Sequence, residues 1–164
     1  MALEPILVTS QDAADRAFRE HGPKLWRSLL AFTGDPELAS DAMAEAYAQL
    51  LARGPAVHAH ERWVWRAAFR IAAGELKGRR RLLTHGIGAT ESYEMPEPAL
   101  DLIEALGQLS PNQRATVVLR SYADLPTKEI ARILGMSQAT VRVHLSQARR
   151  RLRPMLEESD ERPA

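Results

Sequence analysis

The sequence contains no cysteine, and it also lacks a long apolar run and a secretory leader at its start. Without cysteine, a disulfide framework and a thiolate zinc site are both excluded. No stretch approaches the roughly eighteen apolar residues that a membrane-spanning helix needs. The opening MALEPILVTSQDAAD has neither the basic start nor the apolar core of a signal peptide. These absences predict a cytoplasmic protein without membrane insertion.

Motifs of the common enzyme classes are missing as well. The sequence has no Gly-rich phosphate loop and no Ser/His/Asp or Cys/His arrangement at catalytic spacing. His58, His60 and Glu61 form the one compact set of potential metal ligands. No fourth ligand or acid–base partner stands at motif spacing from them. We therefore expect a protein that is not an enzyme and that binds neither a metal nor a cofactor.

The net charge of +1 conceals a strong asymmetry along the chain. Residues 84–104 contain five acidic residues and no lysine or arginine. Residues 110–153 contain nine basic residues and only two acidic ones. A local positive excess of this size indicates an anionic partner for the C-terminal part, so the near-neutral total does not argue against nucleic acid.

Apolar residues recur at helical spacing along most of the chain, and no strand-like alternation is present. The spacing predicts helices over residues 12–32, 36–53, 61–81, 102–109, 111–122, 127–134 and 138–156. Gly22 and Pro23 are expected to bend the first helix, and Asp35 to cap the second. Residues 82–98 are rich in Gly, Thr, Ser, Glu and Pro, and no apolar face continues through them. We predict an all-α protein with two small helical domains (residues 1–81 and 101–156), a flexible acidic linker (82–100) and a disordered acidic tail (157–164).

The segment 127–145 has the spacing of a helix-turn-helix motif. Ala131 is small where two helices must approach closely, and Gly135 can adopt the left-handed conformation that the turn requires. Ser137 is placed to cap the second helix. An apolar stripe then follows at helical spacing, made of Val141, Leu145, Ala148 and Leu152.

The polar side of this second helix carries side chains suited to DNA. Side chains near its start can read base edges in the major groove, a role that we assign to Arg142, Val143, Ser146 and Gln147. Side chains at its margins can hold phosphates, a role that we assign to Gln138, Thr140, Arg149 and Arg150. The alternative is a helical hairpin whose basic face is only solvated. The combination of small residue, glycine, cap and stripe favours DNA binding.

Residues 106–152 resemble region 4 of bacterial sigma factors, the domain that reads the minus-thirty-five promoter element. The similarity is carried by LSPNQR at 109–114, LRSYADL at 119–125 and KEIA at 128–131. The same motif also resembles the DNA-binding domain of LuxR-type response regulators. This half alone therefore leaves two classes of DNA-binding protein open.

The stretch GDPELASDAMAEAY at 34–47 is similar to sigma region 2, in which an Asp and a Glu four residues apart lie on the helix that binds the polymerase clamp. Asp41 and Glu45 occupy those positions, and Gln49 lies one turn further. Helical periodicity places all three on one face, so the resemblance implies that they bind core polymerase. The alternative is an ordinary solvated acidic face. Ala44 stands where the family usually has Gln.

The stretch WVWRAA at 63–68 resembles the family segment that binds and opens the minus-ten element. On a helix, the core face would consist of Trp65, Ala68, Phe69, Ala72 and Leu76. The opposite face carries one aromatic and several basic side chains, which suit base stacking and phosphate contacts with single-stranded DNA. These side chains are Trp63, Arg66, Arg70 and Lys77, continued by Arg79, Arg80 and Arg81. The alternative for Trp63 is packing within its own domain. Arg70 and Gly74 replace the Asn and Asp that the family has in this helix.

The two resemblances stand in the right order and cover nearly the whole chain. They imply an alternative sigma factor of the extracytoplasmic-function (ECF) type. Its implied partners are promoter DNA, core RNA polymerase (the clamp of the largest subunit and the flap region) and an anti-sigma factor. Two other interpretations stay open: a sigma mimic that binds a sigma antagonist instead of polymerase, and a stand-alone helix-turn-helix regulator. The basic residues in both halves favour a working sigma factor.

Overall fold

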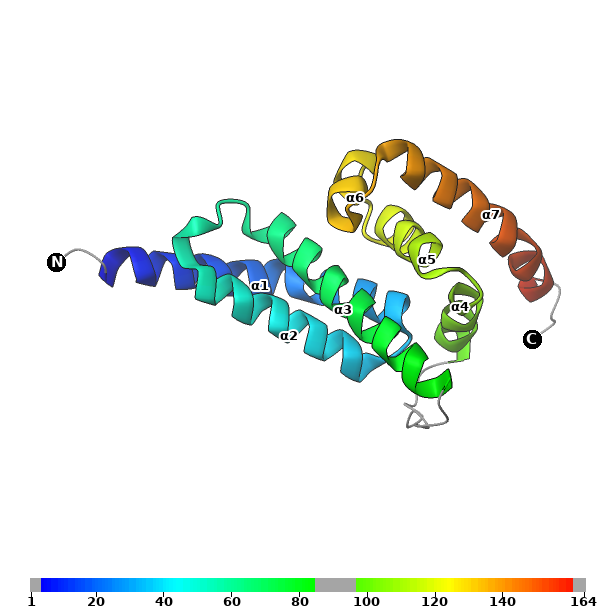
Figure 1. Cartoon of the computed structure of the whole chain (residues 1–164), viewed down its shortest axis with the longest axis horizontal. Coiled ribbons are helices and arrows are strands. Elements are labelled where there is room, and N and C mark those ends of the chain that lie inside the picture. Colours follow the sequence, from blue (N-terminus) through cyan, green and yellow to red (C-terminus); the bar gives the residue numbers. More distant parts are fainter. Residues whose placement is uncertain (1–3, 85–96, 161–164) are drawn as a thin grey trace. The chain divides into compact units, whose positions relative to one another are not determined.

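The computed structural model describes residues 4–84 and 97–160, and within them every regular element is a helix (Figure 1). The elements are α1 (Glu4–Thr33), α2 (Pro36–Arg53), the 3₁₀ turn η1 (Gly54–Ala56), α3 (His60–Thr84), α4 (Glu97–Gly107), α5 (Pro111–Val117), the π-helical turn η2 (Val118–Tyr122), α6 (Thr127–Leu134) and α7 (Gln138–Asp160). They group into two compact units: unit 1 (Met1–Ala89) contains α1–α3, and unit 2 (Thr90–Ala164) contains α4–α7. The prediction of an all-α fold is confirmed. None of the described helices has the length and apolar character needed to span a bilayer.

In unit 1 the three helices pack against one another around an aromatic core. Leu25 and Leu29 of α1 are fully buried. The ring centroid of Phe32, also on α1, lies 5.3 Å from that of Phe69 on α3, and Phe69 stacks on Trp65 at 6.1 Å. Burial of side chains of this size contributes about 1.5–3 kcal/mol each. The predicted core face of α3 is confirmed, with Trp65, Ala68, Phe69 and Ala72 buried and Leu76 half-buried.

The boundary between α1 and α2 is set by two residues. Gly34 has a φ of 70°, a left-handed conformation that costs glycine little. The next residue, Asp35, caps α2: its Oδ1 accepts hydrogen bonds from the backbone N–H groups of Glu37 (2.9 Å) and Leu38 (3.1 Å). The cap predicted from the sequence is therefore confirmed.

In unit 2, α5 and α6 pack against α7. The core of the unit consists of Leu106, Leu109, Ala115, Leu119, Ile130, Val141, Leu145 and Ala148. Helix α5 begins with a capping box, in which the side chains of Ser110 and Gln113 each accept a hydrogen bond from the other's backbone N–H. Arg114 donates from Nε to the carbonyl oxygen of Leu106 at 2.8 Å, so it satisfies an acceptor at the end of α4.

Two helices begin earlier than the apolar spacing predicted. Helix α1 starts at Glu4 instead of residue 12 and continues through Pro23 as one helix. Helix α4 starts at Glu97, five residues before the predicted residue 102. A proline in the first turn of a helix lacks only an N–H that would have no partner there. Pro98 therefore fits inside α4, whereas the sequence pattern places it in the linker.

Two helices also end later than predicted. Helix α3 continues to Thr84, so the predicted linker 82–100 is helical at both of its ends, and its middle (85–96) lies outside the described residues. Helix α7 continues to Asp160, four residues into the predicted disordered tail. Glutamate is a good helix former, and the residues that follow Leu156 contain no helix breaker before Asp160.

The predicted helix over 111–122 is α-helical only as far as Val117. It continues as the wider turn η2, in which the N–H of Ala123 donates to the carbonyl oxygen of Val118 at 3.0 Å. Asp124 follows with a φ of 56°, a conformation that aspartate tolerates better than most residues. Apolar spacing does not distinguish such a turn from a continuing α-helix.

Candidate nucleic-acid interface

The turn between α6 and α7 has the geometry of a helix-turn-helix motif. Gly135 ends α6 in the left-handed conformation, with φ 66° and ψ 37°. The Oγ of Ser137 accepts a hydrogen bond from the backbone N–H of Thr140 at 3.0 Å. Ala131 and Val141 are both buried where the two helices meet. The roles predicted for the small residue, the glycine, the cap and the returning apolar residue are all confirmed.

The side chains expected to read bases lie on the exposed face of α7; they are Arg142, Val143, Ser146 and Gln147. Val143 is 53% exposed although it is apolar, so its methyl groups are accessible to a thymine methyl. Gln147 is held from α5, because Nε2 of Gln113 donates a hydrogen bond to its Oε1 at 3.0 Å. Gln113 is itself fixed by the capping box. The Gln147 amide is therefore oriented before any partner binds.

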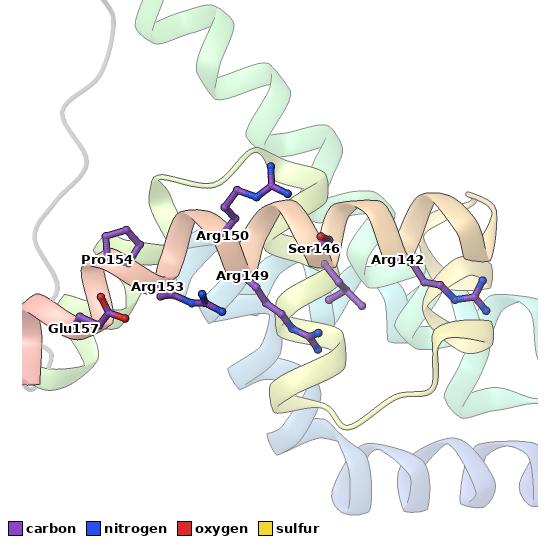
Figure 2. A pocket seen from close by; sticks show the side chains of 8 residues that line it. Arg142, Ser146, Arg149, Arg150, Arg153, Pro154 and Glu157 are labelled. Carbon is purple, nitrogen blue, oxygen red and sulfur yellow. The ribbon is translucent and has the colours of Figure 1, made fainter.

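The residues expected to hold phosphates are also exposed, and they lie at both ends of the base-reading set: Gln138, Thr140, Arg149 and Arg150. The hydroxyl of Thr140 is hydrogen-bonded to that of Ser137 at 2.8 Å, so Thr140 also supports the cap. An open groove follows α7, lined mainly by Arg142, Ser146, Arg149, Arg150, Arg153 and Glu157 (Figure 2). In the described part of unit 2, none of these four arginines forms an ion pair, so their charges are available to an anion.

Three arginines of unit 2 outside α7 have partners within the unit. Arg132 pairs with Glu129 at 2.9 Å. Arg120 donates from Nη1 to the carbonyl oxygen of Leu125 at 3.1 Å, and Arg114 binds the end of α4. Helix α7 carries five arginines, the largest group of basic side chains on any helix of the described part of the unit: Arg142, Arg149, Arg150, Arg151 and Arg153.

The acidic face of α2 is exposed as expected. Asp41 and Glu45 are exposed and Gln49 is half-buried. Nε2 of Gln49 donates a hydrogen bond to Oε1 of Glu45 at 2.8 Å, one helical turn away. The three side chains thus form one continuous polar surface on α2.

This surface is one wall of a groove between α2 and α3. Asp41, Glu45 and Gln49 line the α2 side, and Arg70, Glu75 and Arg79 line the α3 side. Ala44 and Gly74 also border the groove. The three positions that depart from the family pattern (Ala44, Arg70 and Gly74) therefore lie on the same groove. Arg70, which we expected to contact DNA, is placed beside the acidic residues expected to contact polymerase.

The exposed side of α3 carries the remaining predicted minus-ten contacts. Arg66 and Lys77 are exposed, and Trp63 is half-buried. The Cζ of Arg53, at the end of α2, lies 5.3 Å from the ring centroid of Trp63. Trp63 therefore interacts within its own unit through one face and is only partly accessible.

The structure places Arg79 differently from its neighbours. Nη1 of Arg79 donates to Oδ2 of Asp35, the residue that caps α2. Burial raises the pKa of the Asp35 carboxyl, but hydrogen bonds from Leu38, Arg79 and Glu37 outweigh burial and hold that pKa below its ordinary value. The side chains of Arg80 and Arg81 lie outside the described residues.

Sequence reasoning missed three functional partners: Asp35 for Arg79, Arg53 for Trp63 and Gln113 for Gln147. Each pair joins different helices, so no local spacing pointed to it. Of the residues weighed as metal ligands, His58 and Glu61 are exposed and His60 is half-buried. Residues 4–84 and 97–160 contain no group of three or more His, Asp or Glu side chains arranged to hold a metal ion.

Residues 99–152 match the family model described as Sigma-70, region 4. The chain is 30% identical over 156 residues to the ECF RNA polymerase sigma factor SigL of Mycobacterium tuberculosis, an alignment that covers 86% of this chain and 87% of SigL. Over 59 residues it is 46% identical to the RNA polymerase sigma-E factor of Streptomyces antibioticus, covering 36% and 33% of the two chains.

Two solved structures share the fold. The sigma factor RpoE of Bartonella quintana, in complex with the anti-sigma factor NepR, has a TM-score of 0.77 and 18% identity; the match covers 87% of this chain and 96% of RpoE. CnrH, in complex with the cytosolic domain of CnrY, has a TM-score of 0.64 and 19% identity, and 94% of both chains is covered. At these identities the likeness supports the fold alone.

Proposed function

This chain belongs to the ECF sigma factors, and we propose that it binds the core of bacterial RNA polymerase in the cytoplasm and directs initiation at a specific set of promoters. The observation that carries the proposal is the identity to SigL, which extends over 87% of that sigma factor and so includes both helical units. Sigma factors are transcription initiation factors, so we assign this chain no catalytic reaction of its own.

Unit 2 reads the minus-thirty-five element with α7. In this proposal Arg142, Val143, Ser146 and Gln147 contact base edges in the major groove, because they lie on the exposed face near the start of the helix. The phosphate contacts come from Gln138, Thr140, Arg149 and Arg150, and we add Arg153 because it lines the same groove. Elsewhere unit 2 meets the flap region of polymerase.

Unit 1 binds the polymerase clamp with α2. Asp41 and Glu45 are exposed and, among the described residues, neither forms an ion pair, so both are available to basic side chains of the partner. Gln49 continues the same surface. An acidic face of this kind suits a basic helix of the clamp.

Unit 1 also binds the minus-ten element with the exposed side of α3. Arg66 and Lys77 supply positive charge for the phosphates of single-stranded DNA, and the accessible part of Trp63 offers a stacking surface. Arg80 and Arg81 follow on the same helix. Each unit is small, and the non-specific part of its DNA affinity, which comes from phosphate contacts, weakens as the salt concentration rises. Selectivity therefore requires both elements to be bound at once by residues 1–81 and 101–156, the two domains that we propose.

We also propose an anti-sigma factor as a partner. The RpoE structure with a similar fold is a complex with the anti-sigma factor NepR. A sigma factor without cysteine has no thiol switch of its own, so an inhibitory protein is a suitable means of control.

The polymerase part of the proposal is tested by co-purification of the full chain with core polymerase. We expect a stoichiometric complex that survives gel filtration. Absence of a complex would contradict the proposal and favour a sigma mimic or a stand-alone DNA-binding regulator.

A further inference from the structure

We propose that Arg79 is a positioning residue, and that its ion pair with Asp35 ties the promoter-binding end of α3 to the first turn of the polymerase-binding helix α2. This inference rests on the proposed function and deepens it. It gives Arg79 a different role from the other basic residues of α3 for which we predict a DNA contact, namely Arg66, Arg70, Lys77, Arg80 and Arg81.

Three helices of unit 1 meet at Asp35. The side chain of Asp35 is only 11% exposed. Its Oδ1 is used by the cap of α2, and its Oδ2 accepts from Nη1 of Arg79 on α3. Oγ1 of Thr33, the last residue of α1, donates to the Asp35 carbonyl oxygen at 3.0 Å. If Arg79 turned away to bind a phosphate, it would leave a buried carboxylate oxygen without its charged partner, which is strongly unfavourable.

Over residues 73–79 this ion pair is the polar contact that holds α3 to the start of α2. Beyond Ala72 the helix contains Gly74 and Gly78, and glycine is among the poorest helix formers. No heavy atom outside the local chain lies within 4 Å of a Cβ built at either glycine, so neither packs against a neighbour. Within residues 73–79, the stretch whose side chains are described, Arg79 makes the one side-chain hydrogen bond to another element.

The pair also connects the two functional surfaces of unit 1. Asp35 precedes Asp41 by six residues on the helix proposed to bind the clamp. Lys77, Arg80 and Arg81 lie within two residues of Arg79 on the helix proposed to bind the minus-ten element. Arg79 is the last α3 residue along the groove between the two helices. The ion pair therefore sets the spacing of α2 and α3 at that end.

A positioning residue and a phosphate contact behave differently when salt is varied. The binding constant falls as salt concentration rises. Loss of one phosphate contact makes the slope of log binding constant against log salt concentration less steep by about one. Loss of a positioning residue leaves that slope unchanged. The variant Asp35→Asn further distinguishes a positioning role of Arg79 from a phosphate contact. Asparagine caps a helix as well as aspartate does, but it does not carry the charge that holds Arg79.

The test uses holoenzyme made from core polymerase and the full chain. The probe is a promoter fragment that wild-type holoenzyme has selected from a randomised pool, with 2-aminopurine in the minus-ten element to report strand opening. The variants are Arg79→Gln, Arg79→Lys, Asp35→Asn and the Asp35→Asn/Arg79→Gln double variant. Lys77→Gln is the matched control for a phosphate contact. Core binding, opening rate and salt slope are measured for each.

We expect Arg79→Gln and Asp35→Asn to slow opening by a similar factor, about tenfold for the loss of one charge-assisted hydrogen bond. The double variant should be no slower than either single variant, because all three remove the same interaction. Arg79→Lys should restore most of the rate. Core binding should fall by less than opening does, because Arg79 lies only at the end of the groove. The salt slope should stay at the wild-type value, whereas Lys77→Gln should lower the slope by about one.

The proposal is overturned if Arg79→Gln lowers the salt slope by about one while Asp35→Asn opens the promoter normally, since Arg79 would then be a phosphate contact. It is also overturned if core binding falls in parallel with opening, which would indicate a general loss of structure. Should Arg79→Gln fail to fold, Asp35→Asn and Arg79→Lys carry the same test. A wild-type chain that does not bind core polymerase would instead contradict the proposed function itself.

Discussion

Gln113 of α5 donates a hydrogen bond from Nε2 to Oε1 of Gln147 on α7, at a distance of 3.0 Å. The bond uses one of the two lone pairs of Oε1 and holds this oxygen beside Gln113, so the amide N–H₂ is the group of Gln147 that has both of its hydrogens free for a base edge. A free N–H₂ donates to an acceptor on a base edge, such as N7 or O6 of guanine. The bond thus favours the donor role of a side chain that could otherwise act equally as donor or acceptor.

Replacing Gln113 with Glu should reverse that choice. The carboxylate keeps the capping box with Ser110, since Glu and Gln serve equally there. It no longer donates to Gln147, so the Gln147 amide turns its N–H₂ toward the new carboxylate and its oxygen toward the DNA. We expect selection from a randomised upstream element to change at one base pair, by about 1–3 kcal/mol, toward a base that presents a donor. Asn112→Glu adds the same charge beside it and should weaken binding without changing the preferred base.

Replacing Arg142 with Ala should relax specificity in the upstream element. A bidentate contact to a base contributes about 1–3 kcal/mol of discrimination. The measurement is holoenzyme affinity for a panel of single-base variants of the element. Arg149→Ala, a proposed phosphate contact on the same helix, should weaken every member of the panel equally. An equal loss across the panel for Arg142→Ala would make it a phosphate contact as well.

Reversing both charges of the acidic α2 face should abolish polymerase binding. Asp41→Lys/Glu45→Lys presents like charge to a basic partner, and we expect affinity for core polymerase to fall about a hundredfold or more. Both side chains are exposed, so circular dichroism and the melting temperature should stay close to wild type. The matched control is Asp12→Lys/Asp15→Lys, the same charge change on exposed residues of α1. Undiminished binding by the α2 variant would remove the docking proposal.

The groove between α2 and α3 can be tested by filling it. Gly74→Leu places a large side chain on the groove wall and improves helix propensity, so a loss of function cannot come from a weaker helix. We expect affinity for core polymerase to fall by about tenfold, the scale of a steric misfit. Gly78→Leu is the matched control, since it also has open space around its Cβ but does not line the groove. Equal behaviour of the two variants would show that the groove is not part of the docking surface.

The lowered pKa of Asp35 makes stability depend on pH in one direction. A carboxyl whose pKa is lower in the folded state stabilises the fold at pH values above its ordinary pKa of about 3.9. That contribution is lost as the pH falls through the lowered pKa. We expect the difference in unfolding free energy between wild type and Asp35→Asn, measured in urea, to shrink as the pH is lowered from 6 toward about 2. A difference that does not change with pH would contradict this.

Local features of the fold could be predicted from the sequence because their causes are local. The left-handed Gly135, the cap by Ser137 and the buried Val141 all follow from neighbours within one or two turns. The cap by Asp35 follows in the same way. These local features are enough to predict that the elements are helices and which face of α7 is exposed.

The contacts that modify the site join residues far apart in the chain. Arg79 and Asp35 are 44 residues apart, and Gln113 and Gln147 are 34 apart. Whether such residues meet depends on how helices pack, which periodicity does not specify. The run of three arginines predicts a DNA contact for Arg79, and only the packing of α3 beside α2 places this side chain on a carboxylate.

The central claim is that this chain directs core polymerase to promoters with two spaced elements. The measurement that tests it most directly is run-off transcription with core polymerase, the full chain and a randomised pool of promoter fragments, followed by sequencing of the templates that yield transcripts. We predict initiation from a subset that shares an upstream and a downstream element at one fixed separation, and none without the chain. Transcription that is independent of the chain, or templates that share no paired elements, would contradict the account.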